Sequence, residues 1–174
     1  MIKILYKNIN SVLFPISFPT EKTVVLGVDT APNRTGWCLL KWIPKKEIQL
    51  DYGFIDIKSD NILDKYNLLI DFFENNTKGA DKVIIEESFY ALNVKSFQKL
   101  SRVGMIVYVC AYFNKVKNIQ FLLANQARNR IGLKNGKKEI VHQEFLKKYK
   151  IKIKEPNCLD ACILALSGVN CNYK

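Results

Sequence analysis

The sequence has few of the residues on which zinc sites and disulfide scaffolds depend. It contains one histidine, His142, and none of its five cysteines belongs to a CxxC pair. A single histidine argues against a His-rich zinc site and weakens any Ser-His-Asp or Cys-His nucleophile. An odd number of cysteines in mostly apolar settings is typical of a reducing compartment. Because His142 lies in a Lys-rich helical stretch, we expect it at the surface.

Apolar runs long enough to cross a membrane are also missing. The longest run, Val103 to Phe113, is about half of the ~20 residues that a transmembrane helix needs. The apolar segment from Ile9 is interrupted by Pro15 and Pro19 and lacks a cleavage site, so residues 1–22 are predicted to be an N-terminal extension, not a signal peptide. We expect a cytoplasmic protein of a bacterium, of a virus in its host or of an organelle.

Acidic residues are scarce in one half of the chain. The 174 residues carry 27 Lys and Arg against 16 Asp and Glu, a net charge of +11. Residues 91–154 hold fifteen basic and two acidic residues, whereas the rest holds twelve and fourteen. Lysines on the solvated helix faces of a protein from an AT-rich genome are one explanation. The near absence of acids and the interleaved aromatics favour a polyanionic partner.

The apolar pattern predicts a single α/β domain over residues 23–174. Strands are predicted over residues 23–29, 35–42, 47–57, 82–86 and 118–124. Helices are predicted over residues 61–75, 94–113, 137–149 and 156–167. A three-strand antiparallel meander followed by α/β units indicates a mixed five-stranded sheet flanked by helices. Residues 125–130 and 134–138 are predicted to be polar, basic loops.

Three acids fall where such a sheet collects its ligands. Asp29 ends the first strand of the domain and Glu86 the fourth, and ligands bind beyond the carboxyl ends of strands. Asp160 lies on the last helix, with Asn157 one turn before it on the same face. Each acid alone is better explained as a strand end or helix cap. Together they predict a Mg²⁺ or Mn²⁺ site, because oxygen ligands select these ions and a cation relieves carboxylate repulsion.

The segments that carry these acids resemble a known family. The runs LGVDTAPNRTGW (residues 26–37), IEESF (85–89) and PNCLDACILAL (156–166) are similar to motifs of the RuvC-type Holliday-junction resolvases, which belong to the RNase H-like, retroviral integrase superfamily. The resemblance covers roughly residues 24–167. It implies an RNase H-like fold and a homodimeric crossover junction endodeoxyribonuclease. Such an enzyme resolves four-way (Holliday) DNA junctions by paired, symmetric, metal-dependent nicks. It also implies that Asp29, Glu86 and Asp160 are metal ligands.

Asn157 departs from the family pattern, which usually has an acid three residues before the last Asp. A neutral amide oxygen can bind Mg²⁺ but holds it less firmly than a carboxylate. We expect two ions in the catalytic site. In this arrangement we expect Asp29 to bridge the two ions, Glu86 to bind the first ion, and Asp160 and Asn157 to bind the second. Two alternatives stay open, a debranching nuclease for fork or flap DNA and a junction-binding protein with weakened catalysis.

The resemblance and the charge pattern together predict the DNA-binding residues. The resemblance puts Arg128 and Lys138 near basic residues that the family uses at DNA, and Phe89 on an aromatic placed against bases near the crossover. The neighbouring aromatic Tyr90 can also stack on an unpaired base, although core packing is the alternative for both. The remaining predicted contacts are cations that bind phosphate, namely Lys95, Lys99, Arg102, Arg130, Lys134 and Lys137.

The helix predicted over residues 94–113 is apolar nearly all round from Gly104 to Ala111, which predicts burial on more than one side. A helix-mediated two-fold dimer and a central helix packed on the sheet both satisfy this pattern. The expected partners are branched DNA and a second copy of the chain, with no membrane. Branch-migration proteins are left open as further partners.

Overall fold

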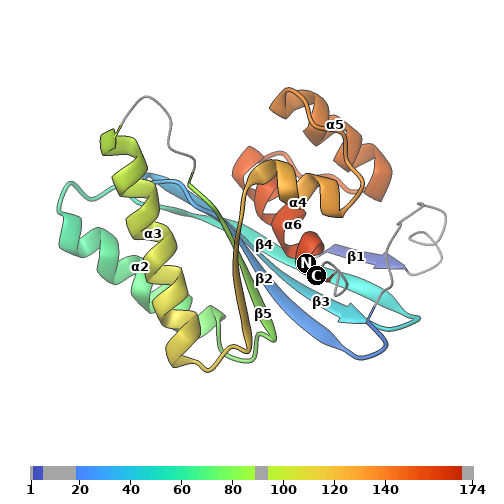
Figure 1. Cartoon of the computed structure of the whole chain (residues 1–174), viewed down its shortest axis with the longest axis horizontal. Helices are drawn as coiled ribbons and strands as arrows, with labels where there is room; N and C mark the ends of the chain where they lie inside the picture. The colour runs from blue at the N-terminus through green and yellow to red at the C-terminus, as the bar shows by residue number, and fades with distance from the viewer. Residues whose placement is uncertain (1, 6–18, 89–93, 170–174) are drawn as a thin grey trace.

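A mixed sheet forms the middle layer of the molecule (Figure 1). The structure is a computed structural model that describes residues 2–5, 19–88 and 94–169. The strand order is β1-β4-β3-β2-β5-β6. Strand β2 (Thr23–Asp29) pairs antiparallel with β3 (Arg34–Ile43) and parallel with β5 (Lys82–Glu86). The change from antiparallel to parallel pairing therefore occurs at β2, the strand that ends in the first candidate acid.

The five predicted strands are all present, and the α/β fold with a mixed sheet is confirmed. Strand β4 (Glu47–Asp56) completes the antiparallel meander, and β6 (Asn118–Leu122) pairs parallel with β5. A short sixth strand, β1 (Ile2–Leu5), pairs antiparallel with β4 at the edge of the sheet. Part of the segment predicted as an extension thus adds a strand to the domain.

Helices cover both faces of the sheet (Figure 1). On one face lie α2 (Ile62–Asn76) and α3 (Val94–Phe113), and on the other lie α4 (Ala124–Arg130), α5 (Lys138–Tyr149) and α6 (Pro156–Val169). The sheet therefore separates two apolar cores. No helix in the described part of the chain is long and apolar enough to span a membrane.

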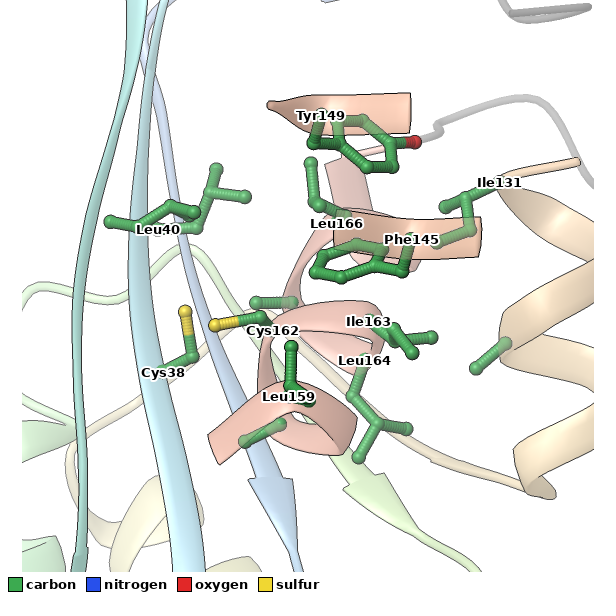
Figure 2. Close-up of a cluster of buried hydrophobic side chains, with 14 of the residues drawn as sticks. Cys38, Leu40, Ile131, Phe145, Tyr149, Leu159, Cys162, Ile163, Leu164 and Leu166 are labelled. Carbon is green, nitrogen blue, oxygen red and sulfur yellow. The ribbon is translucent and has the colours of Figure 1, made fainter. Parts of the chain in front are cut away.

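The core on the α6 face joins α5 and α6 to the meander (Figure 2). Phe145 and Tyr149 of α5 lie with ring centroids 4.8 Å apart and pack over Leu166 of α6. Leu40 of β3 faces the same cluster and is fully buried. This packing fixes α5 relative to α6, which matters for the site because both helices contribute to it.

Two glycines allow α6 to lie directly on the sheet. A Cβ at Gly27 of β2 would lie 2.3 Å from the Ala161 carbonyl oxygen. A Cβ at Gly36 of β3 would lie 2.3 Å from the Asn157 carbonyl oxygen. Because Gly36 pairs with Asp29 in the sheet, the first turn of α6 lies beside the end of β2.

One predicted loop is a helix, so that prediction was wrong. Residues 125–130 lie in α4, whose first turn is capped by a hydrogen bond from the Leu123 N–H to the Gln126 side-chain oxygen at 3.0 Å. Ala127 is fully buried against the α6 core. A polar seven-residue helix is too short for periodicity to reveal, and tertiary packing of one alanine face stabilises it. Residues 134–137 form a loop, as predicted.

Gly104 of α3 faces the sheet. A Cβ there would lie 3.2 Å from the Phe121 ring of β6 and 3.6 Å from Ile85 of β5. The close approach at Gly104 is therefore one of helix to sheet, and this face of α3 packs as a central helix does. The opposite face of α3 stays exposed.

Candidate active site

Asp29 and Glu86 end two neighbouring parallel strands, as predicted. The register pairs Val28 with Ile85, so the next residue on each strand brings the two acids side by side. The Thr30 hydroxyl donates to the Glu86 carbonyl oxygen at 3.4 Å and ties the two strand ends together. Asp29 is only 6% exposed, whereas Glu86 is half-buried.

These surroundings strongly favour the neutral form of Asp29. Burial, followed by a hydrogen bond with Glu86 and the charges of Glu86 and Asp160, raises the pKa of Asp29 to about 10. Asp29 therefore keeps its proton at neutral pH, in a hydrogen bond with Glu86. A buried carboxyl group beside a second carboxylate offers a cation a place where it can replace the proton.

Asp160 comes to the same place from α6. Its charge is one of the influences that raise the pKa of Asp29, which puts the two carboxylates within electrostatic range. The close packing of α6 at Gly27 and Gly36 produces this proximity. Pro156 begins the helix, a position that suits proline because its missing N–H has no partner in the first turn.

Three basic side chains contact the Asp160 carboxylate. Lys138 Nζ lies 2.5 Å from Oδ2, His142 Nε2 lies 2.9 Å from Oδ1, and Arg128 Nη2 lies 4.0 Å from Oδ1. Burial alone would raise the pKa of Asp160, but hydrogen bonds from His142 and Lys138 and their charges lower it. Asp160 is therefore ionised and surrounded by donors.

The position of His142 corrects the prediction that it lies at the surface. His142 is buried, with 8% exposure, on the inner face of α5. The sequence carried a signal for this, because residues 142, 145 and 149 fall on one helical face and Phe145 and Tyr149 belong to the core. The surrounding lysines hid that pattern.

The three acids fit a divalent cation by chemistry but do not form a finished cage. Among residues 2–5, 19–88 and 94–169, no group of three or more His, Cys, Asp or Glu side chains is arranged to hold a metal ion. Both oxygens of Asp160 are engaged by His142 and Lys138. Burial lowers the pKa of Lys138, but the hydrogen bond and charge of Asp160, with a smaller contribution from the Asp29–Glu86 pair, raise it above its ordinary value. A positive charge is thus already drawn to this all-oxygen donor set.

A family model named crossover junction endodeoxyribonuclease RuvC matches residues 25–167. The chain belongs to the RuvC family. The match contains Asp29, Glu86, Asn157 and Asp160, so the resemblance inferred from the three motifs is confirmed.

Individual RuvC proteins and other resolvases are also similar to the chain. The RuvC of Sulfurovum sp. (strain NBC37-1), a crossover junction endodeoxyribonuclease, is 30% identical over 80 residues, which are 45% of this chain and 50% of that protein. The aligned part therefore spans about half the length of that relative.

Two solved structures share the fold. Thermus thermophilus RuvC, in complex with a Holliday junction substrate, has a TM-score of 0.68 at 15% identity and covers 83% of this chain and 92% of its own. The yeast mitochondrial Holliday junction resolvase Ydc2 has a TM-score of 0.58 at 13% identity and covers 94% and 82%. These similarities agree with the RNase H-like fold predicted from the motifs.

Asn157, which is predicted to stand where the resolvases usually have an acid, has an amide nitrogen that is already engaged. Nδ2 donates to the Arg34 carbonyl oxygen at 2.5 Å, which ties the start of α6 to β3. Arg34 in turn forms a salt bridge with Asp56 at 2.7 Å and lies 3.5 Å from Glu155. Only the amide oxygen of Asn157 remains available as the predicted metal ligand.

The predicted DNA-binding cations of the chain fall into three groups. Arg128 and Lys138 reach the candidate site itself, where both contact Asp160. Arg130 donates to the Gln120 side chain at 2.9 Å, so part of its role is to join α4 to β6. The others are exposed, on the first half of α3 or in the loop before α5, namely Lys95, Lys99, Arg102, Lys134 and Lys137. The aromatic predictions, Phe89 and Tyr90, lie outside the described residues.

Proposed function

We propose that the protein resolves Holliday junctions by metal-dependent hydrolysis of one phosphodiester in each of two symmetric strands. The observation that carries the proposal is the meeting of Asp29, Glu86 and Asp160 at the carboxyl ends of β2 and β5, inside a RuvC-family domain. Thermus thermophilus RuvC and fowlpox virus resolvase, both similar in fold, have been solved with Holliday junction DNA. This favours the four-way junction over forks or flaps as the substrate.

The side chains divide the work of hydrolysis between them. Bound Mg²⁺ or Mn²⁺, which we propose as two ions in each site, would supply the Lewis acid needed to activate water and to stabilise the charge on the phosphate. On the strand side, the metal would be held by Glu86 and by Asp29 after it loses its proton. On the helix side, it would be held by Asp160 and the Asn157 amide oxygen. Water must attack phosphorus in line with the departing 3′ oxygen.

Lys138 has a second task once Asp160 binds a cation. Its side chain is 46% exposed, so it can leave Asp160 and face solvent or DNA. An ammonium released at this point would lie beside the bound phosphate, where it can contact a phosphate oxygen. Arg128, which is 14% exposed, would remain in place and contribute positive charge.

Paired nicking requires two sites, and we propose that α2 and α3 form the interface of a homodimer. An apolar groove of about 540 Å³ lies between these helices, lined in part by Ile70, Met105, Val109 and Phe113. Met105 is 50% exposed and Phe113 is 76% exposed, a large apolar surface for a chain so rich in lysine. A second copy is the occupant that would also supply the second active site.

A cleavage assay tests this function. Four-way junction, replication fork, flap and linear duplex of shared sequence are incubated with protein in Mg²⁺ or Mn²⁺, with each strand labelled in turn. We expect symmetric nicks in two opposing strands of the four-way junction. Analytical ultracentrifugation of the same protein should give a dimer at micromolar concentration.

Asp29→Asn is the control, and we expect it to bind the junction without cutting it. Nicks confined to forks or flaps would replace the proposal with the debranching nuclease. Binding of the junction without cleavage by the wild-type protein, in both metals, would replace it with the junction-binding protein.

A further inference from the structure

The Asp160 carboxylate has one neighbour whose position is fixed by the core. His142 Nε2 lies 2.9 Å from Oδ1, and the two side chains are 10% and 13% exposed. Lys138, the other close contact, is 46% exposed at the end of a flexible side chain. The histidine contact is therefore the more rigid of the two.

The rigidity of His142 comes from its helix. Val141, Phe145 and Tyr149 of α5 are 1%, 0% and 3% exposed in the core that α5 shares with α6. Lys150 caps the C-terminus of α5 in a left-handed conformation, and its N–H donates back to the Leu146 carbonyl oxygen. His142 and Asp160 thus lie on two helices that are packed against each other in one core.

We propose that His142 is a positioning residue that holds Asp160 in the orientation in which it binds the divalent cation. The inference rests on the proposed function, because it assigns Asp160 as a metal ligand. Since an ionised carboxylate only accepts hydrogen bonds, Nε2–H is the donor and Oδ1 the acceptor. Fixing Oδ1 restricts rotation of the carboxylate and directs Oδ2, once Lys138 has left, toward Asp29 and Glu86.

The composition of α6 increases the importance of Asp160. Asn157 offers a neutral amide, so Asp160 is the one charged ligand that α6 contributes. An ill-positioned Asp160 would leave the helix side of the site with no fixed negative oxygen. Hydrogen-bond donors behind metal ligands typically change metal affinity by about 10–100-fold when they are removed.

Substitutions at position 142 separate the hydrogen bond from simple packing. Gln places an amide N–H close to the location of Nε2, so His142→Gln should retain the contact. Leu fills a similar volume without a donor, and the shorter Asn cannot reach Asp160. Val141→Ala is the matched control, because it removes packing from the same helix one residue away without touching Asp160.

The first measurement is Mn²⁺ binding to the DNA-free protein, which electron paramagnetic resonance detects. Cleavage is then measured as a function of Mg²⁺ and of junction concentration. We expect His142→Leu and His142→Asn to weaken Mn²⁺ binding by about 10–100-fold. The Mg²⁺ concentration for half-maximal cleavage should rise in parallel, and KM for the junction should not change. His142→Gln should stay within about threefold of wild type, and Val141→Ala should lower Tm but leave Mn²⁺ binding unchanged.

The outcomes distinguish this inference from the proposed function. Wild-type Mn²⁺ affinity in both His142→Leu and His142→Asn would overturn the positioning role, and should one of them fail to fold, the other decides. A Mn²⁺ affinity in His142→Gln as low as that in His142→Leu would also overturn the positioning role, because the hydrogen bond would then not be what His142 contributes. Absence of Mn²⁺ binding in the wild-type protein, or a Mn²⁺ affinity in Asp29→Asn equal to that of the wild type, would overturn the proposed function and the positioning role with it.

Discussion

The carboxylates on the strands and the carboxylate on the helix have opposite electrostatic surroundings. Burial and the neighbouring Glu86 raise the pKa of Asp29, so it carries a proton at neutral pH. Hydrogen bonds from His142 and Lys138 lower the pKa of Asp160, so it carries a charge. Basic side chains hydrogen-bond directly to the carboxylate on the helix side, whereas Lys138 acts on the strand side only through its charge. A divalent cation that bound here would have to replace a proton on the strand side and Lys138 on the helix side.

Removing a carboxylate from each side should have the same effect on cleavage and opposite effects on stability. Loss of a metal ligand is worth several kcal/mol of transition-state stabilisation, so Asp29→Asn and Asp160→Asn should each reduce cleavage by about 10³-fold. In EDTA, Asp29→Asn should raise Tm, because it removes a buried acid that opposes its neighbours. Asp160→Asn should lower Tm by about 2–4 °C, since it removes the negative charge that pairs with Lys138 and His142.

Differential scanning calorimetry without metal measures both shifts. Shifts in Tm of the same sign for Asp29→Asn and Asp160→Asn would contradict the electrostatic contrast between the strand and helix sides. A parallel junction-binding assay shows whether each variant has kept its fold and its DNA surface.

Gly27→Ala should disturb the packing of α6 on the sheet, which brings Asp160 close to Asp29. The added methyl group would meet the backbone of α6 at Ala161 and Ala165, so the helix must move outward. Overpacking of this kind costs about 1–3 kcal/mol. Asp160 would move away from Asp29, and Mn²⁺ affinity should fall with stability. Gly136→Ala is the matched control, because nothing lies within 4 Å of a Cβ there. Unchanged Mn²⁺ affinity in Gly27→Ala would mean that the packing of α6 does not set the site.

The pH dependence should report the strand side. Between the ordinary pKa of 3.8 and about 10, the folded chain holds a proton on Asp29 that the unfolded chain has lost. The free energy of unfolding of the metal-free protein should therefore fall as pH rises through this range. A metal that displaces this proton should gain up to about tenfold in apparent affinity for each pH unit.

Mn²⁺ titrations from pH 6 to 8.5 in wild type and Asp29→Asn give this slope. We expect a steep slope in wild type and a shallower one in the variant. Identical slopes would show that Asp29 does not carry the displaced proton.

Lys138→Gln tests whether the lysine competes with metal for Asp160 on the helix side. The pair with Asp160 is half-exposed at the lysine, so losing it is worth about 0.3–1 kcal/mol. Without this internal cation, Mn²⁺ should bind about 2–5-fold more tightly. Cleavage should nevertheless decrease, because the ammonium is also needed at the phosphate. Calorimetric Mn²⁺ titration and single-turnover cleavage separate the two effects, and weaker Mn²⁺ binding in Lys138→Gln would show that the lysine does not compete with metal.

The strand side of the site was predictable from sequence, and the helix side only in part. Asp29 and Glu86 end strands whose β-branched runs locate them within one residue, and parallel pairing does the rest. Asp160 could be assigned to a helix, but its partners come from α4 and α5, far along the chain. Local patterns do not encode which helices meet, so His142 was predicted to be at the surface.

Two elements that the sequence did not indicate, β1 and α4, have the same physical origin. Strand β1 forms because the edge of β4 accepts a partner from a segment distant in sequence. Helix α4 exists because Ala127 packs into a core made by other elements. In both cases tertiary contacts decide a structure for which the local propensity is weak.

The most direct test is a crystal structure of the protein grown with Mn²⁺, with anomalous diffraction recorded to locate the metal. The prediction is a peak between the carboxylates of Asp29, Glu86 and Asp160, with Lys138 moved away from Asp160 and His142 still hydrogen-bonded to it. A crystal grown with Mn²⁺ in which Lys138 still contacts Asp160 and the manganese lies elsewhere would contradict a shared metal site.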